Sequence, residues 1–254
     1  MAKGVKSIKD IRQYWDSEAK LGPDRSVIDR NDKKGNKIKY ITWLRDRAVL
    51  NELSDIAASS RILDLGCGSG HLSKTLDKEG FCISGADISL KILKYTQHQK
   101  FRQPSLFVQY DGKCLPFSAN CFDACVVSGV LCYLNDANSL FQVLKEVSRV
   151  LKPGGRLVAV EQTRRTRKYK QNNMKLQRPV SEIFQTLDES GLVNKSQQVI
   201  RRGHFPLIYP IRYGLIPSRL FPYVGKTEVL FGRVFSQPFF DYADTVFVAE
   251  KPAD

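Results

Sequence analysis

An aliphatic run that ends in an acid and continues into three alternating glycines most constrains how this 254-residue chain can fold. It reads Ile62-Leu63-Asp64-Leu65-Gly66-Cys67-Gly68-Ser69-Gly70. The branched residues predict a buried strand, and glycine lets the backbone after it lie against a ligand without a Cβ in the way. A helix is expected over 70–79. The segment therefore predicts a strand, a tight turn and a helix, in that order.

Strands and helices alternate from about residue 61 onward, which predicts an α/β fold with a mostly parallel sheet covered by helices on both faces. The expected strands cover 61–65, 81–86, 105–110, 122–128, 155–161, 192–201 and 242–251. The other expected helices cover 89–100, 136–151 and 180–190. Ser89 should cap the helix that it begins. Lys152-Pro153-Gly154-Gly155 should stop the helix before it, since proline cannot continue a helix.

The residues outside the alternating strands and helices indicate how the chain is divided into domains and segments. Residues 1–58 should form a helical N-terminal extension or lid, and 59–254 the α/β domain. Within that domain, 162–178 are basic and 203–240 form an aromatic, proline-rich insertion between the last two strands. The insertion suits a substrate lid, an interfacial surface or a small satellite core, and the residues leave these alternatives open.

A net charge of +14 favours contact with an anionic partner. RNA or an acidic membrane surface could bind the basic segment 162–178, and a solvated basic face explains the charge equally well. No apolar run approaches the roughly 20 residues of a membrane-spanning helix, and no secretion signal is visible. We expect a cytoplasmic protein without a transmembrane segment, and contact with a membrane surface is left open.

The cysteines predict buried thiols rather than a metal site. They are Cys67, Cys82, Cys114, Cys121, Cys125 and Cys132. None forms a Cys-x-x-Cys pair, and no histidine stands at metal-ligand spacing from them. Reduced core thiols of a cytosolic protein are therefore expected, and no metal is expected.

Spacing decides which ligand the glycine turn suits. A dinucleotide fingerprint needs a glycine directly after Gly70, and a phosphate-binding loop ends in Gly-Lys-Ser/Thr. The chain has His71-Leu72 there, so it fits neither pattern. The acid Asp64 before the turn suits a ligand with a positive amino group better than a pyrophosphate.

Two more acids follow the next two expected strands. Asp87 lies about 20 residues past the turn, where an acid in such folds accepts hydrogen bonds from ribose hydroxyls. Asp111, followed by Gly112, could accept from an adenine amino group, although an ordinary Asp-Gly turn would look the same. The segments 122–131 and 150–157 complete the pattern, the first as a strand whose exit can line a cofactor.

Together these motifs resemble the class I S-adenosylmethionine (SAM)-dependent methyltransferases, and most closely those of small-molecule and quinone biosynthesis. The resemblance covers about residues 61–162. It implies a Rossmann-like seven-stranded sheet whose last two strands form an antiparallel hairpin. It also implies S-adenosyl-L-methionine as the cofactor and methyl transfer as the activity.

The resemblance also implies roles for individual residues. The turn, with Asp64, Gly66, Cys67, Gly68 and Gly70, would hold the methionine part of SAM. The ribose and adenine would meet Asp87, Ile88, Asp111 and Gly112. Ser128 and Leu131 would line the cofactor near its methyl group. An aromatic residue of the N-terminal extension, Tyr14 or Trp15, would close over the cofactor, unless both simply pack their helix.

The acceptor is less constrained. Ser128-Gly129-Val130-Leu131 replaces the Asp/Asn-Pro-Pro-Tyr/Phe motif of enzymes that methylate base amines, so that reaction is disfavoured. An oxygen or carbon acceptor needs a general base, and the candidates are Glu161, at the end of the fifth strand, and His204, at the start of the insertion. Alternatively, neither residue is the base: Glu161 forms an ion pair with a nearby arginine at the rim of the site, and His204 has a surface role.

Three functions remain open. The preferred one is O- or C-methylation of a small or lipid-linked molecule. The basic segment favours an RNA (tRNA or rRNA) methyltransferase instead. A catalytically inactive SAM-binding module is the third.

Overall fold

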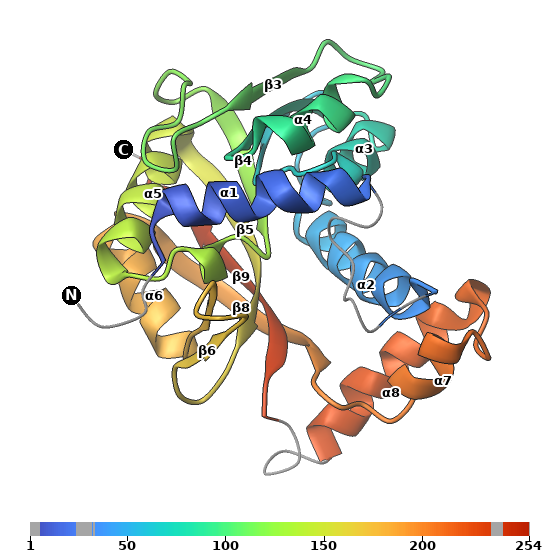
Figure 1. Cartoon of the computed structure of the whole chain (residues 1–254). Helices are drawn as coiled ribbons and strands as arrows, with labels where there is room; N and C mark the ends of the chain where they lie inside the picture. The colour runs from blue at the N-terminus through green and yellow to red at the C-terminus, as the bar shows by residue number, and fades with distance from the viewer. Residues whose placement is uncertain (1–5, 24–31, 33, 235–240, 254) are drawn as a thin grey trace.

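The computed structural model describes residues 6–23, 32, 34–234 and 241–253, and it contains one seven-stranded sheet (Figure 1). The strands, in their order across the sheet, are β3 (Leu106–Gln109), β2 (Cys82–Asp87), β1 (Arg61–Leu65), β4 (Phe122–Ser128), β5 (Leu151–Thr163), β9 (Ala243–Glu250) and β8 (Val193–Arg202). β9 runs antiparallel to both of its neighbours, and the other six strands all run in one direction. The prediction of a mostly parallel sheet with a closing antiparallel hairpin is confirmed.

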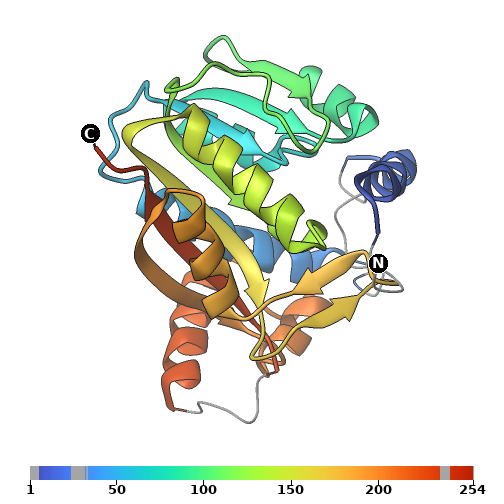
Figure 2. The same ribbon diagram turned by 90° about the vertical axis from the view of Figure 1, so that its left-hand side faces the viewer.

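Helices cover both faces of the sheet (Figure 2). The helices are α1 (Ile8–Glu18), α2 (Asn36–Glu52), α3 (His71–Lys78), α4 (Leu90–Gln97), α5 (Ala137–Val150), α6 (Val180–Glu189), α7 (Ile208–Tyr213) and α8 (Phe221–Val234). One buried cluster joins α5 and α6 to the sheet. A second joins α2, α3 and α4 to the opposite face, which confirms the layered α/β fold.

Local signals set most helix boundaries. The Ser89 hydroxyl accepts from the Ile92 N–H, as expected of an N-cap, and Asp136 caps α5 in the same way. The end of α5 differs slightly from the prediction. The helix stops at Val150, and Pro153-Gly154-Gly155 lies inside β5 rather than before it. A register irregularity opposite Phe122 and Ala124 accommodates these residues.

The two flanking segments have more regular structure than the sequence indicated. Within 162–178, β6 (Lys168–Lys170) and β7 (Lys175–Gln177) pair as a separate hairpin. The insertion is helical: α7, the short 3₁₀ turn η3 (Ser218–Leu220) and α8 pack on α2 in a satellite core with Tyr40 and Leu44. No described helix is long and apolar enough to cross a membrane.

Candidate cofactor and acceptor site

The glycine turn lies at the carboxyl end of β1, between β2 and β4. In open α/β sheets, ligands bind in the crevice where connections leave in opposite directions, as they do here. Gly66, Gly68 and Gly70 all have positive φ, at 76°, 53° and 85°. A Cβ on Gly66 would overlap the Val130 side chain, whereas one on Gly68 would meet its nearest atom only at 3.9 Å. Gly68 therefore leaves an open cradle beside its backbone.

Side chains of α4 and of the residues just after it fix the shape of this turn. The Thr96 hydroxyl donates to the Gly68 carbonyl at 2.6 Å, and the Gln99 amide donates to the Ser69 carbonyl at 2.5 Å. The Gly68 N–H donates to Asp87 Oδ2 at 2.9 Å. Sequence reasoning missed Thr96 and Gln99, because nothing in the local pattern at the end of α4 or just after it marks them.

Two buried carboxyls flank the turn. Asp64 accepts from the Ser73 hydroxyl at 2.5 Å, and burial raises its pKa to about 7. Burial likewise raises the pKa of Asp87, although the backbone N–H groups of Ser89 and Gly68 oppose the shift. Each Asp87 oxygen accepts one of these N–H groups. Because a carboxylate has about four acceptor sites, Asp87 retains capacity for ligand hydroxyls.

The predicted adenine-side residues come together. A Cβ on Gly112 would lie 3.5 Å from Ile88 Cδ1 and 2.8 Å from Ile8 of α1. Asp111 Oδ1 accepts from the Lys113 and Cys114 N–H groups at 2.8 Å each, and these bonds hold the pKa of Asp111 below its ordinary value. Asp111 thus forms the expected Asp-Gly turn, beside an apolar pair that a planar ring can contact.

Helix α1 covers this edge of the sheet, as Figure 1 shows. Asp16 accepts from the Ser89 hydroxyl at 2.5 Å. The Trp15 ring packs edge-on against Tyr133, with 5.2 Å between centroids, and Tyr14 packs edge-on against Trp15. Both aromatic residues therefore pack α1 against the loop after β4, and the helix as a whole forms the cover.

The residues predicted to line the cofactor near its methyl group lie at the exit of β4. Ser128 is partly exposed at the strand end, and the Leu131 side chain is buried in the main core. The neighbouring Val130 side chain lies against Gly66 of the glycine turn. Cys67 is also buried in the core, so only its backbone is available to a ligand. Of the six free cysteines, three are buried and only Cys114 is exposed.

Glu161 lies on β5 directly beside this exit. It is 2% exposed, and its Oε1 accepts from the Leu131 N–H at 2.6 Å. Among the described residues, its Oε2 has no hydrogen-bond partner. Burial raises the pKa of Glu161, while Arg45 and Lys175 act in the opposite direction. Among the described residues Glu161 forms no rim ion pair, and it is instead a buried carboxyl with one unpartnered oxygen.

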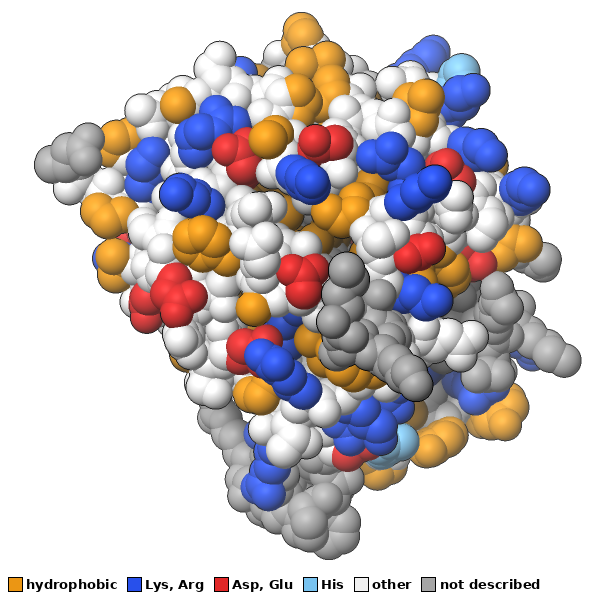
Figure 3. Space-filling model, turned by 60° about the vertical axis from the view of Figure 1, so that its left-hand side comes forward, with side chains coloured by type: hydrophobic (Ala, Val, Ile, Leu, Met, Phe, Trp, Pro, Cys, Tyr) orange, Lys and Arg blue, Asp and Glu red, His pale blue; other side chains and the backbone are white. Residues whose placement is uncertain are grey.

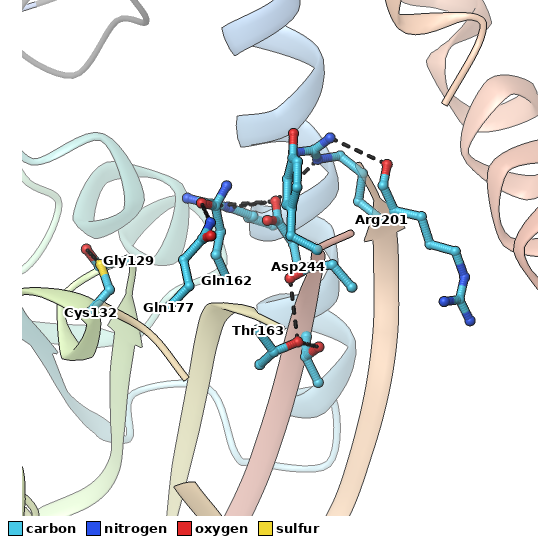
Figure 4. Close-up of polar contacts among 12 residues, drawn as sticks. Gly129, Cys132, Gln162, Thr163, Gln177, Arg201 and Asp244 are labelled. Atoms are coloured by element: carbon cyan, nitrogen blue, oxygen red, sulfur yellow. Dashed lines mark hydrogen bonds and ion pairs between the residues drawn. The ribbon is translucent and has the colours of Figure 1, made fainter. Parts of the chain in front are cut away.

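A buried ionic cluster adjoins Glu161 and was not predicted. Asp244 Oδ2, on β9, accepts hydrogen bonds from Arg45 Nη2 at 3.1 Å and from Arg201 Nε at 3.2 Å. Both cations hold the pKa of Asp244 down, to about 2. In Figure 4, the hydrogen-bonded amides of Gln162 and Gln177 lie close to Asp244. Polar side chains thus surround the sheet edge next to the predicted methyl position.

His204 is not brought to Glu161. Its side chain is exposed, its Nε2 lies 3.5 Å from Asp241 Oδ1, and its ring packs against Tyr242. These contacts place it at the start of the insertion, as predicted, in a surface setting.

Two cavities lie elsewhere on the molecule. One of about 340 Å³ opens between the start of α1, Lys113 and residues 133–136. Another of about 230 Å³ lies between β8 and α8. The lining of neither cavity includes a residue of the glycine turn.

Internal ion pairs involve three of the seven Lys and Arg residues of the basic segment. Arg164 pairs with Asp241 at 2.8 Å, and Glu182 accepts from both Arg167 and Arg178. Arg178 is buried and also donates to the Leu131 carbonyl at 3.0 Å. On the face drawn in Figure 3, Lys and Arg side chains are scattered among acidic and hydrophobic ones rather than gathered in one stripe.

Known proteins match the central part of the chain. Residues 63–159 match a family model described as a methyltransferase domain. A demethylmenaquinone methyltransferase of Corynebacterium kroppenstedtii is 36% identical over 115 residues, 45% of this chain and 47% of that protein. The mitochondrial ubiquinone biosynthesis O-methyltransferase of the rat is 30% identical over 167 residues, 61% of this chain and 45% of that protein. The chain therefore spans about half the length of these relatives.

Solved structures match nearly the whole fold. Geranyl diphosphate C-methyltransferase of Streptomyces coelicolor, solved with Mg²⁺, geranyl diphosphate and S-adenosyl-L-homocysteine, has a TM-score of 0.65 at 15% identity, covering 99% of this chain and 100% of that one. The [4+2]-cyclase SpnF has a TM-score of 0.61 at 19% identity, covering 82% of each chain. The strand order, the glycine turn and the family match agree, and they identify residues 63–159 as a methyltransferase domain.

Proposed function

We propose that this protein transfers a methyl group from S-adenosyl-L-methionine to an oxygen or carbon atom of a small or lipid-linked acceptor. The observation that carries the proposal is Glu161, a buried carboxyl next to the exit of β4 whose Oε2 has no hydrogen-bond partner among the described residues. The quinone-type relatives support the acceptor class.

The residues present fit the cofactor. The open cradle at Gly68 and the spare acceptor capacity of Asp87 suit the methionine and ribose parts. Ile88 and Gly112 suit the adenine. When bound, SAM supplies a methyl group already activated on a sulfonium.

The chain's own residues then supply position and a base. A cover such as α1 excludes water and holds the acceptor, and such positioning can contribute about 7–11 kcal/mol. Glu161 would accept the proton that an acceptor hydroxyl or activated carbon loses. Its raised pKa brings its basicity closer to neutral pH, which suits a general base.

Labelled SAM incubated with the protein and a metabolite extract tests the activity, and small-molecule product is expected. Glu161→Gln keeps an acceptor for the Leu131 N–H but removes the base, so turnover should fall about 10²–10⁴-fold. Glu228→Gln is the matched control, since Glu228 is also buried but lies in the satellite region, bonded to Tyr40 and the Arg202 N–H. Equal losses in both variants would contradict the assignment of Glu161.

RNA methylation is the second candidate, motivated by the net charge of +14. It predicts RNA binding that weakens steeply with salt, and labelled product in RNA alone would favour it over a small acceptor. The internal pairing of Arg164, Arg167 and Arg178 speaks against it.

The third candidate is an inactive SAM-binding module. A fold of this kind does not by itself fix the reaction, as the cyclase among the similar structures illustrates. Calorimetry with SAM and its demethylated product measures binding separately from turnover, and any turnover excludes this candidate.

A further inference from the structure

The outer face of the insertion is unusually apolar for a surface. We call it the outer insertion face and define it by its exposed residues, Tyr209, Tyr213, Leu215, Arg219, Leu220, Tyr223, Lys226 and Leu230. Leu215 is 75% exposed, Tyr223 67% and Tyr213 64%. Single exposed apolar residues need no explanation, but a cluster of large ones over two neighbouring helices marks a binding surface.

The packing of α7 and α8 turns this face away from the protein. Ile208 and Ile211 of α7, with Phe221 and Val224 of α8, are buried against α2. On α8, Tyr223, Lys226 and Leu230 follow one another at helical spacing and are all exposed. The buried and exposed residues thus occupy different sides of each helix. The satellite core fixes the inner side, and the outer side has no apolar partner among the described residues.

The charge of this face has one sign. Between residues 205 and 240 the sequence has a single acid, Glu228. Glu228 is buried and accepts from the Tyr40 hydroxyl and the Arg202 N–H, so it does not reach the outer face. Arg219 and Lys226 are exposed beside the leucines and tyrosines. Lys and Arg with large apolar side chains and tyrosines are what a helix lying in an anionic membrane interface presents.

We propose that the outer insertion face docks on an anionic lipid bilayer. A second copy of the chain fits less well, since a two-fold interface would bring the same cations together without acids to pair them. RNA fits less well too, because exposed leucines neither stack on bases nor bind phosphates. The proposal does not depend on methyl transfer, since the face lies on α7, η3 and α8, outside the residues assigned to the cofactor and to Glu161.

Vesicle flotation with the full chain tests this without SAM or an acceptor. The protein should float with phosphatidylcholine vesicles containing 30% phosphatidylserine far more than with pure phosphatidylcholine. Arg219→Gln with Lys226→Gln should weaken partitioning about fivefold per lost cation. Tyr213→Ser with Leu215→Ser should weaken it at least roughly tenfold, because two apolar side chains no longer enter the interface.

Matched controls lie elsewhere on the surface. Leu106→Ser removes a leucine that is 54% exposed on β3, and Lys91→Gln with Lys94→Gln removes two exposed cations of α4. These variants should partition within twofold of the parent, and circular dichroism should show that every variant is folded. The proposal is overturned if the face variants and the controls lose binding equally. It is also overturned if the parent does not float, if the face variants only convert a dimer to a monomer, or if only RNA binding changes.

Discussion

Replacing Asp64 by asparagine should stabilise the cofactor-free protein above neutral pH, because burial makes the ionised form of Asp64 unfavourable in the folded state. Asp64 is 2% exposed, and burial raises its pKa from 3.8 to about 7. At about 1.36 kcal/mol for each tenfold change in proton affinity, that difference amounts to about 4 kcal/mol. Asparagine has nearly the same shape and can still accept from the Ser73 hydroxyl, but it needs no ionisation.

The sign follows from proton linkage. Between pH 4 and 7 the folded state holds the Asp64 proton and the unfolded state does not, so native stability falls as pH rises through this window. Urea unfolding without SAM should therefore show Asp64→Asn close to the parent at pH 4 and more stable by up to about 4 kcal/mol at pH 8. The same variant should bind SAM more weakly, since it lacks a charge for the ammonium group. An Asp64→Asn protein that is equally destabilised at both pH values would refute the reasoning.

Three other changes have defined outcomes. Glu161→Gln should flatten the acidic limb of the rate–pH profile, because that limb reports protonation of the base; a limb that persists unchanged argues for another group. Gly66→Ala should lower the unfolding free energy by about 1–3 kcal/mol, since its Cβ would overlap Val130. Adding Val130→Ala should restore part of that loss in thermal melts, and failure to do so would assign the cost to the positive φ alone. Asp244→Asn should cost about 3–5 kcal/mol in chemical unfolding, because it leaves the buried Arg201 without its carboxylate. A cost below 1 kcal/mol would show that the cluster is solvated.

The sequence predicted those parts of the fold and site that depend on neighbouring residues. The strand before the glycine turn, the positive φ at its glycines and the Ser89 cap all arise within a few positions of one another. The mostly parallel sheet followed from the alternation of strands with helices, and the closing antiparallel hairpin followed from the family resemblance. These signals placed Gly68, Asp87 and Gly112 at one edge of the sheet.

Contacts between distant residues could not be predicted in the same way. Arg45 and Asp244 are 199 positions apart, and nothing near either residue indicates that the two form a buried pair. The placement of Val130 beside Gly66 was not predicted, because the short 3₁₀ turn that follows Val130 has no sequence signal of its own. The burial of Arg178 could not be predicted either, because the side chains of a basic stretch are ordinarily exposed to solvent.

The satellite core joins segments that are far apart in the sequence, and this has a consequence for synthesis. The Tyr40 hydroxyl donates to Glu228 across 188 residues, and α2 packs on helices that are synthesised much later than α2 itself. At 5–20 residues per second, α2 waits roughly 10–40 s for that partner. During this time, Tyr40 and Leu44 present an uncovered apolar stripe on the nascent chain. The interval makes α2 the segment at which a chaperone would engage the chain during synthesis.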